Sequence, residues 1–361
     1  MATVVARGIQ GGLRPAWRRS AQVQMQYGRS TLRAASSSTV STGPQNGPRH
    51  SDLAPWYRSC LFVPGDSERK LRKSVECGAD LCILDLDDGV GHDKKAMARE
   101  MICNIVPQLV YPSTTNTLVR LNATSALTRD GLSQLELDVG MLSTMKTLPS
   151  AVGLSKADTA QDVETFITLL DKHLPQDIPP LGIYLMVESP LAIVTLEDIC
   201  SALVNASQSM RLKSFLPGGL AFGHMDYCTD MGIDTTVYDR SKFLFAEQKL
   251  ATVARAYRLQ AMDCAYTLVK DLDGLRTDCQ HAKQSGFTGK TLIHPSHVSV
   301  ANEVFSPPAK QVAWARGLLD AYARHNADGQ AVFVHEGELV DEPIFRRARL
   351  MLEAADRHSS V

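Results

Sequence analysis

The first 50 residues of this 361-residue chain contain no acidic residue and no lysine, although they hold seven arginines and a serine-rich run from Ser36 to Ser41. An acid-free start rich in arginine and serine is typical of a mitochondrial transit peptide, and a plain disordered extension is the alternative. Without those seven arginines the 38 basic residues fall to 31 against 39 acidic ones, so the formal net charge moves from -1 to -8. A body this acidic argues against nucleic acid as a partner.

The chain also lacks a long apolar run, a cysteine framework and a dinucleotide-binding motif. No stretch approaches the ~20 apolar residues of a membrane-spanning helix, so no membrane partner is predicted. The eight cysteines form no CxxC pair, and in a chain of this length they predict reduced core thiols, with one nucleophilic thiol as the alternative. The pattern GxGxxG is absent, which argues against a dinucleotide-binding sheet.

From residue 58 onward, short apolar runs alternate with polar-faced segments of helical length. This alternation is typical of repeated βα units around a parallel sheet. Eight units predict an α/β fold, a TIM (β/α)8 barrel over residues 56–305, with a doubly wound open sheet as the alternative. The expected strands are Cys60–Val63, Leu81–Leu86, Thr117–Leu121, Val152–Ser155, Ile183–Val187, Leu216–Phe222, Met262–Val269 and Thr291–Ile293.

A tail follows that a barrel does not need. After the break at Pro307 and Pro308 come a helix-like stretch Gln311–His325, a β-like segment Ala331–Val340 and an amphipathic helix from Pro343. We therefore expect a C-terminal helical and β extension over residues 306–361, after a leader over residues 1–50 and the barrel.

Two of the expected strands lead into a carboxylate. The apolar run Leu181–Val187 is followed by Glu188, and Phe215–Phe222 leads to Asp226. In a barrel, function sits at the carboxyl ends of the strands. Mg2+ is held in proteins by one or two carboxylates together with water and substrate oxygens. The pattern predicts a metal site at the barrel mouth, with helix capping as the alternative for either residue taken singly.

Further polar residues follow the other strands. Asp85, Asp87 and Asp88 surround the end of the second strand and predict either metal ligands or a second shell that orients the metal's waters. Arg120 ends the third run and predicts a site for a carboxylate or an oxyanion, unless it pairs with one of those acids. Lys156 ends the fourth run and predicts a contact with the same cavity, with a surface lysine as the alternative.

The first strand is followed by a turn at Pro64 and Gly65 and then by a helix dense in positive charge. Arg69 and Lys73 are four residues apart and therefore lie on one helical face. Together with the free N–H groups at the helix start, they predict a site for an anionic or phosphorylated ligand. A solvated, exposed helix would have the same composition.

Two other patterns do not support a site. Gly289-Lys290-Thr291 looks like the end of a phosphate-binding P-loop, but the first glycine of that motif would fall at Gln284, and a strand follows where a helix is required. His294 and His297 are three residues apart with Pro295 between them. The proline indicates a turn at the end of a strand, which favours core or loop packing over metal ligation.

Several of these segments, in this order, resemble the citrate lyase beta subunit family of the HpcH/HpaI-type aldolase superfamily. The resemblance spans roughly residues 56–355 and is nearest to the mitochondrial citramalyl-CoA lyase branch. The segments that carry it are Leu61-Phe-Val-Pro-Gly65, Leu84-Asp-Leu-Asp-Asp-Gly-Val90, Val119-Arg-Leu-Asn122, Val187-Glu-Ser189, Phe222-Gly-His-Met-Asp226 and Gly286-Phe-Thr-Gly-Lys-Thr-Leu-Ile-His-Pro295.

The resemblance implies a TIM barrel, a Mg2+ ion and an acyl-CoA substrate. It makes Glu188 and Asp226 the metal ligands and Arg120 a catalytic, substrate-binding group. Arg69 and Lys73 are expected to contact the ligand near the barrel mouth. Phe62 and Lys156 are further expected substrate contacts.

The tail also carries part of the resemblance. The segment Gly337-Glu-Leu-Val-Asp341-Glu-Pro343 is similar to the family's closing motif, in which the aspartate acts in the active site of a neighbouring subunit. Asp341 is therefore the expected acid/base, and a homotrimer is the expected assembly. From the residues alone, Asp341 would be the N-cap of a helix that has Pro343 in its first turn, which is compatible with that role.

The chain departs from the family at several positions. The family usually has Glu-Asp where this chain has Asp87-Asp88, and again where it has Met225-Asp226, so one second-shell carboxylate is shortened and another is missing. The family's Leu-Pro-Lys is Leu154-Ser155-Lys156 here, and the branch's tyrosine before Val-Pro-Gly is Phe62. The reaction type is thus more firmly implied than the preferred substrate.

The reaction that the resemblance implies is reversible cleavage of a 3-hydroxyacyl-CoA, with citramalyl-CoA giving acetyl-CoA and pyruvate in the mitochondrial matrix. A malate synthase or malyl-CoA thioesterase activity on acetyl-CoA and glyoxylate or another 2-oxo acid is one alternative. A catalytically silent acyl-CoA-binding protein is another, because Asp87 and Met225 depart from the family pattern.

The leader gives a first prediction. A fluorescent protein fused behind residues 1–50 should enter mitochondria, because an arginine-rich segment without acids suits import. Fluorescence microscopy with a mitochondrial marker measures this. The same fusion with the seven arginines changed to glutamine should stay in the cytosol, and a wild-type fusion that also stays there would rule out the targeting role.

Overall fold

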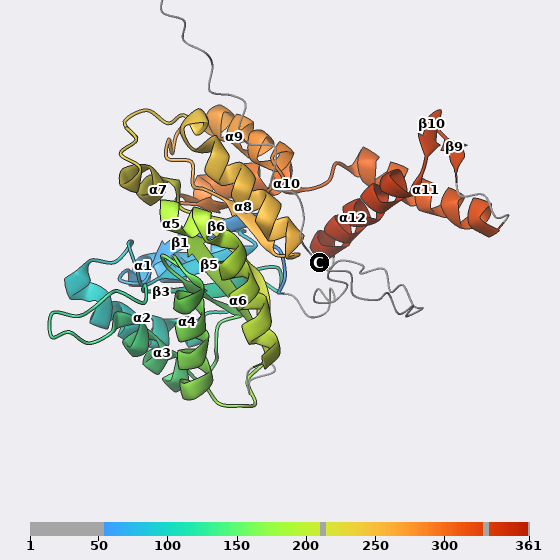
Figure 1. The fold of residues 1–361 in the computed structure, drawn as a ribbon. Helices are drawn as coiled ribbons and strands as arrows, with labels where there is room; N and C mark the ends of the chain where they lie inside the picture. The colour runs from blue at the N-terminus through green and yellow to red at the C-terminus, as the bar shows by residue number, and fades with distance from the viewer. Residues whose placement is uncertain (1–53, 210–213, 328–331, 360–361) are drawn as a thin grey trace, which may run out of the picture. The chain divides into compact units, whose positions relative to one another are not determined.

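The computed structural model describes residues 54–209, 214–327 and 332–359, and the leader predicted over residues 1–50 lies outside them. Eight parallel strands close into a barrel in the order of the sequence, so the predicted TIM barrel is confirmed (Figure 1). The strands are β1 (Ser59–Pro64), β2 (Leu81–Asp85), β3 (Asn116–Leu121), β4 (Ala151–Leu154), β5 (Leu181–Val187), β6 (Phe215–Phe222), β7 (Gln260–Asp263) and β8 (Gly289–Leu292).

Helices connect consecutive strands, as parallel pairing requires. Figure 1 shows α2, α3, α4 and α6 on the outside of the barrel strands. The helices up to the end of the barrel are α1 (Glu68–Lys73), α2 (Lys95–Ile105), α3 (Gln134–Thr144), α4 (Ala160–His173), α5 (Pro190–Val194), α6 (Leu196–Ser209), α7 (His224–Asp230), α8 (Leu244–Ala256), α9 (Leu272–Gln284) and α10 (Val298–Phe305).

The predicted seventh strand was wrong at its carboxyl end. We expected a strand from Met262 to Val269, but β7 ends at Asp263. After Asp263 the chain leaves the barrel as a loop. The apolar run continues in this loop because part of it, including Ala265 and Thr267, lines a cavity. Periodicity alone does not distinguish a strand from a partly buried loop.

The strands are buried on both faces, which explains their nearly continuous apolar runs. In β2, Leu81 and Ile83 point into the barrel and belong to its interior cluster with Tyr184 and Met262. Cys82 and Leu84 alternate with them and pack in the larger cluster that also contains helix residues. The twofold period of a strand thus distributes one run between two cores.

Close approach of backbones requires a glycine at the start of β8. A Cβ added to Gly289 would overlap the carbonyl oxygen of Tyr57, at the position where β8 pairs with the chain that enters β1. Because the obstacle is backbone, a neighbouring side chain cannot rotate away to relieve it. Gly289 therefore permits the last strand to close the barrel.

Buried charges join β7 to β8. Lys290 is fully buried, and its Nζ lies 2.5 Å from Oδ2 of both Asp263 and Asp278. Arg240, which precedes α8, also contacts both aspartates and in addition Glu247. Burial, with the nearby Asp263 charge, raises the pKa of Glu247 to about 8. Two cations therefore face three carboxyl groups, and burial works against the ionisation of Glu247.

The C-terminal extension has its own small core. It contains α11 (Ala309–Ala327), the antiparallel hairpin β9 (Phe333–His335) and β10 (Glu338–Val340), and α12 (Glu342–Ser359). Leu318, Phe333, Val340 and Ala348 are among the residues of this core. The single predicted β segment is therefore a hairpin, turned by Glu336 and Gly337 at positive φ. The proposed division at residues 305 and 306 remains a prediction.

Within the described part of the chain, none of the helices combines the length and apolar character needed to cross a membrane.

The closure of the barrel gives a second prediction. Changing Gly289 to alanine should lower the free energy of unfolding by about 1 to 3 kcal/mol, because the new methyl group overlaps fixed backbone. Urea unfolding followed by circular dichroism measures this. Gly140 in α3 is the matched control, since nothing lies within 4 Å of its added Cβ and alanine should be neutral or stabilise the helix by up to about 1 kcal/mol. Equal effects at both positions would contradict the steric argument.

Candidate active site

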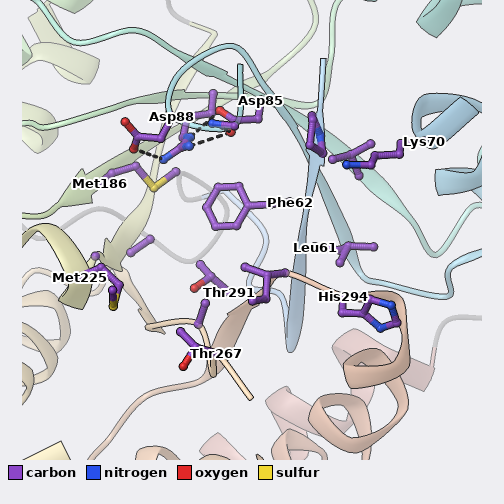
Figure 2. A pocket seen from close by; sticks show the side chains of 18 of the residues that line it. Leu61, Phe62, Lys70, Asp85, Asp88, Met186, Met225, Thr267, Thr291 and His294 are labelled. Atoms are coloured by element: carbon purple, nitrogen blue, oxygen red, sulfur yellow. Dashed lines mark hydrogen bonds and ion pairs between the residues drawn. The ribbon is translucent and has the colours of Figure 1, made fainter. Parts of the chain in front are cut away.

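A cavity of about 790 Å³ opens at the carboxyl ends of the barrel strands. Residues from β1, β2, β3, β5, β6 and β8, and from the loop after β7, line it. In Figure 2, Phe62 lies near the middle of this view, with Asp85 and Asp88 on one side and Lys70 on another. Thr267, Thr291 and His294 border a further part of it. The cavity thus has an acidic region and a basic region.

Three carboxylates converge in the acidic region. Ligand oxygens of Asp88, Glu188 and Asp226 all lie within 4.8 Å of one another. Glu188 follows β5, while Asp226 lies in the first turn of α7, directly after β6. Gly223 allows this approach, because a Cβ there would collide with the Glu188 side chain. The structure therefore brings together the two predicted metal ligands and adds Asp88.

Glu188 is the buried member of this group. Its side chain is 8% exposed, against 50% for Asp88 and 48% for Asp226. Burial raises the pKa of Glu188 to about 7, although the charges of Arg120 and Lys156 oppose the shift. Its Oε2 is buried and accepts no hydrogen bond. A buried oxygen of this kind needs a partner, and three clustered carboxylates suit a hard divalent cation.

Lys156 faces all of these carboxylates. Its Nζ lies 2.8 Å from Asp88 Oδ1, 3.6 Å from Asp226 Oδ2 and 4.0 Å from Glu188 Oε2. Burial lowers the pKa of the lysine, but the hydrogen bond to Asp88 and the nearby negative charges outweigh burial and raise it. The backbone of Lys156 is left-handed, with φ of 49°, which is strained for a residue with a side chain. Lys156 is thus turned toward the acids rather than spread on the surface.

Arg120 makes a two-point ion pair with Asp85. Nε and Nη2 lie 2.7 Å from the two carboxylate oxygens, and β2–β3 pairing places the two residues side by side. The backbone N–H groups of Asp87 and Gly89 donate to the same oxygens. Each Asp85 oxygen therefore already accepts two hydrogen bonds. The ion pair that was the alternative for Arg120 does exist, yet Arg120 also lines the cavity.

The remaining nitrogen of Arg120 points toward the acidic region. Nη1 lies 3.4 Å from Asp88 and 3.7 Å from Glu188. The guanidinium also stacks over Phe62, with Cζ 4.7 Å from the ring centroid. Burial lowers the pKa of Arg120, but the nearby carboxylates, Asp85 above all, together outweigh burial and raise the pKa above its usual value, so the guanidinium stays protonated. Arg120 is thus a rigid cation whose Nη1 faces the cavity through longer contacts, to Asp88 and Glu188.

Asp87 occupies a different place from Asp88. Its side chain lies 3.7 Å from Lys95 and 3.4 Å from Lys156, and its backbone carbonyl accepts from Lys95. Lys95 in turn donates to Asn122. Asp87 therefore joins the acidic region to α2, whereas Asp88 faces the other carboxylates.

The basic region comes from α1. Arg69, Lys70 and Lys73 all line the cavity, while Arg72 turns away and pairs with Glu68 at 2.8 Å. Sequence reasoning selected Arg69 and Lys73 by their spacing but missed Lys70. The short helix places these three cavity-lining residues within little more than one turn. The spacing of residues i and i+4 does not reveal that Lys70 also faces the cavity.

The analysis of the sequence also missed His294, Thr267 and Thr291 as cavity residues. His294 was assigned to core or loop packing, and it does hold the turn after β8 through Ser296, but it lines the cavity as well. His297, in contrast, is fully buried. The position of all three missed residues at or after strand ends was the available signal.

Asp341 directly precedes α12, and its Oδ1 accepts from the N–H of Ile344 at 3.3 Å. This contact is that of a helix N-cap, which the residues alone had indicated. Its expected role in a neighbouring subunit remains a prediction.

Residues 58–295 match the HpcH/HpaI aldolase/citrate lyase family. The chain is 30% identical over 300 residues to mitochondrial citramalyl-CoA lyase of Rattus norvegicus, covering 82% of this chain and 86% of that protein. It is 30% identical over 303 residues to (3S)-malyl-CoA thioesterase of Cereibacter sphaeroides, covering 83% and 95%.

Among solved structures, a similar chain is protein CitE of Mycobacterium tuberculosis in complex with magnesium, acetoacetate and coenzyme A. The TM-score is 0.61 at 25% identity, and the match covers 82% of this chain and 97% of that one. The fold likeness thus extends over nearly all of that protein.

The ion pair under the cavity gives a third prediction. Changing Arg120 to methionine should lower the free energy of unfolding by about 3 kcal/mol, because Asp85 stays buried without its cation. Arg72 is the matched control, since its pair with Glu68 is exposed and its change to methionine should have an effect below about 1 kcal/mol. Urea unfolding of both variants measures the difference. Two equally small effects would show that the Arg120–Asp85 pair adds little to stability.

Proposed function

The chain belongs to the HpcH/HpaI aldolase/citrate lyase family, and on this premise we propose that it cleaves citramalyl-CoA to acetyl-CoA and pyruvate in a Mg2+-dependent reaction. It is an enzyme of the carbon–carbon lyase class. The observation that carries the proposal is the group of Asp88, Glu188 and Asp226 beside Arg120 at the mouth of the barrel.

The residues present fit a magnesium ion. Glu188 has a buried oxygen without a hydrogen bond, and Asp88 and Asp226 place further oxygens within 4.8 Å of its carboxylate. When bound, a magnesium ion supplies Lewis-acid stabilisation of negative charge on the oxygens of the substrate's pyruvyl half. We assign Glu188 and Asp226 as the ligands, with Asp88 beside them and Asp85 and Asp87 in supporting positions.

Arg120 is proposed to stabilise the charge that develops during cleavage. Breaking the bond between the two halves of the substrate leaves a thioester enolate, whose oxygen carries negative charge. Arg120 is already fixed by Asp85 and Phe62, and its Nη1 makes only long contacts to Asp88 and Glu188, so it can donate to that oxygen with little reorganisation. Preorganised donors of this kind give large rate effects.

The substrate's anionic end is proposed to bind at the basic region. Coenzyme A esters carry phosphates, and Arg69, Lys70 and Lys73 place three cations on one wall of the cavity. A volume of about 790 Å³ suits an extended ligand that reaches from this wall to the carboxylates. Phe62 and Lys156 would contact the reacting part of the substrate.

Asp341 is proposed as the acid that protonates the enolate carbon, from a neighbouring subunit of a homotrimer. The support is the similarity of Gly337–Pro343 to the family's closing motif. In this arrangement residues 306–361 form an extension that completes the active site of another subunit, while residues 56–305 form the catalytic barrel.

A mitochondrial location is proposed from the acid-free leader and from the mitochondrial citramalyl-CoA lyases among the relatives. The matrix is the finer assignment, since it is the compartment that a transit peptide normally reaches.

The second candidate function is thioester hydrolysis. It is favoured by the similarity to (3S)-malyl-CoA thioesterase, at 30% identity and 83% coverage of this chain. Such an enzyme releases free coenzyme A, whereas a lyase leaves it esterified.

The fourth prediction tests the reaction directly. Leader-free protein incubated with citramalyl-CoA should form acetyl-CoA and pyruvate in equal amounts, only with Mg2+ and not after chelation. Glu188→Gln and Asp226→Asn should each lower kcat by about 100-fold or more, because each removes a charged metal ligand. Chromatography of the CoA esters with a coupled pyruvate assay measures both products.

The matched control is Asp230→Asn, which changes an exposed aspartate on the same helix α7 and should keep wild-type activity. Free coenzyme A without pyruvate would replace the lyase by the thioesterase. Full activity of Glu188→Gln would remove the proposed metal site.

A further inference from the structure

Two cysteines lie in contact at the end of the cavity wall formed by α1. The Sγ atoms of Cys77 and Cys82 are 3.5 Å apart. Cys77 follows the short helix that continues α1, while Cys82 lies on β2. The Sγ of Cys82 also reaches the carbonyl oxygen of Ser74 at 3.6 Å. Two thiols are therefore held side by side by separate elements of the barrel.

Cys77 is also accessible from the cavity. It lines the cavity together with Lys73 and Ser74, whereas Cys82 is fully buried. Of the eight cysteines only Cys77 and Cys103 are half-buried, and the other six are buried. Cys103 contacts the hydroxyl of Thr144 at 3.7 Å. A small reagent that enters the cavity thus meets one thiol, with a second thiol directly behind it.

The environment favours the thiolate at Cys77. The Cys82 thiol can donate to it and lowers the pKa of Cys77 to about 7, although burial opposes the shift, and the N–H of Ala79 lowers the pKa further. The same contact and burial raise the pKa of Cys82. When Cys77 is protonated, the Cys82 proton can turn to the Ser74 carbonyl instead. Cys77 is therefore the nucleophile and Cys82 the thiol that retains its proton.

We propose that Cys77 and Cys82 form a redox-sensitive pair that hydrogen peroxide entering the cavity converts to an internal disulfide. The Cys77 sulfur attacks the peroxide, the O–O bond breaks, and a sulfenic acid and water form. The sulfur of Cys82 then attacks the sulfenic sulfur, the S–O bond breaks, and a second water leaves with the Cys82 proton. One peroxide is thus reduced by two thiols.

Only a small movement separates the pair from a bond. The sulfurs must approach from 3.5 Å to about 2.05 Å, the S–S length of a disulfide. Gly78, at φ of 70°, directly follows Cys77 and nothing lies within 4 Å of its added Cβ, so the chain has room to adjust there. The short loop from Cys77 to Cys82 can therefore close without moving a strand.

Closure changes the basic region of the cavity. The Cys82 contact with the Ser74 carbonyl is lost, and the Cys77 sulfur turns from the cavity toward β2. Ser74 adjoins Lys73, so the end of α1 that carries this cation shifts with it. None of the carboxylates around Glu188 lies on α1, because Asp88 and Glu188 follow β2 and β5 and Asp226 lies at the start of α7. Oxidation is therefore expected to weaken ligand binding more than turnover.

The test uses hydrogen peroxide on the leader-free protein, with tryptic peptides analysed by mass spectrometry. Both cysteines lie in peptide 74–94, which should lose two hydrogen atoms and regain them with dithiothreitol. Cys103, in peptide 100–120, should react several-fold more slowly, because it does not line the cavity and its Sγ contacts the hydroxyl of Thr144 instead of a second thiol. In Cys82→Ala, the sulfenic acid on Cys77 should persist and be trapped by dimedone.

Cys103→Ser is the matched control and should leave disulfide formation unchanged, whereas Cys77→Ser should abolish it. Oxidation of Cys103 before Cys77, or peroxide treatment that leaves peptide 74–94 reduced, would overturn the proposal.

The effect on ligand binding rests on the proposed function and has a separate readout. Oxidation should raise the KM for citramalyl-CoA roughly tenfold, the size of one lost charge-assisted hydrogen bond, with kcat little changed. Cys77→Ser should be insensitive to peroxide. A disulfide that forms without any change in KM would overturn the link to the cavity, whereas a reduced enzyme without lyase activity would overturn the proposed reaction and leave the thiol chemistry standing.

Discussion

The pairing of Asp85 with Arg120 fixes the acidic region of the cavity. Neighbouring positions on β2 and β3 hold the two side chains, and four donors saturate the carboxylate. Because its oxygens already accept these hydrogen bonds, Asp85 has a structural role. The loop that begins at Asp85 places Asp88 beside the other carboxylates. Arg120, held from below by Phe62, keeps one nitrogen toward the cavity. The positions of Asp88 and of the Arg120 nitrogen that faces it therefore depend on this one buried ion pair.

The balance of charge at the mouth explains why so many acids can lie together. The three carboxylates Asp88, Glu188 and Asp226 face two cations, Lys156 and Arg120. The backbone strain at Lys156 is the energetic cost of placing its ammonium group among the carboxylates. A divalent cation in the same place would take over part of that neutralisation. Either the two side-chain cations or a bound divalent cation can therefore neutralise the carboxylates and limit the repulsion between them.

The fold and the two central carboxylates could be predicted because both follow from short-range patterns. Apolar runs buried on both faces give strands. Glu188 comes directly after β5, and Asp226 lies in the helical turn that follows β6. The selection of Asp88 over Asp85 could not be predicted, since it depends on the path of one loop and on which acid Arg120 takes. Lys70 and the early end of β7 were missed for a similar reason, because side-chain direction and loop departure are set by packing between elements.

The charged seam between β7 and β8 has a consequence for how the sequence can vary. In the apolar layers of the barrel one side chain can change alone, provided that its volume is roughly kept. At the seam Lys290, Asp263, Asp278 and Arg240 each neutralise partners on other elements, and one uncompensated loss leaves a buried charge behind. A substitution at one of these four positions therefore needs a compensating substitution at another. The effects of substitutions are coupled in this way between residues far apart in the chain, from the segment before α8 to the last strand.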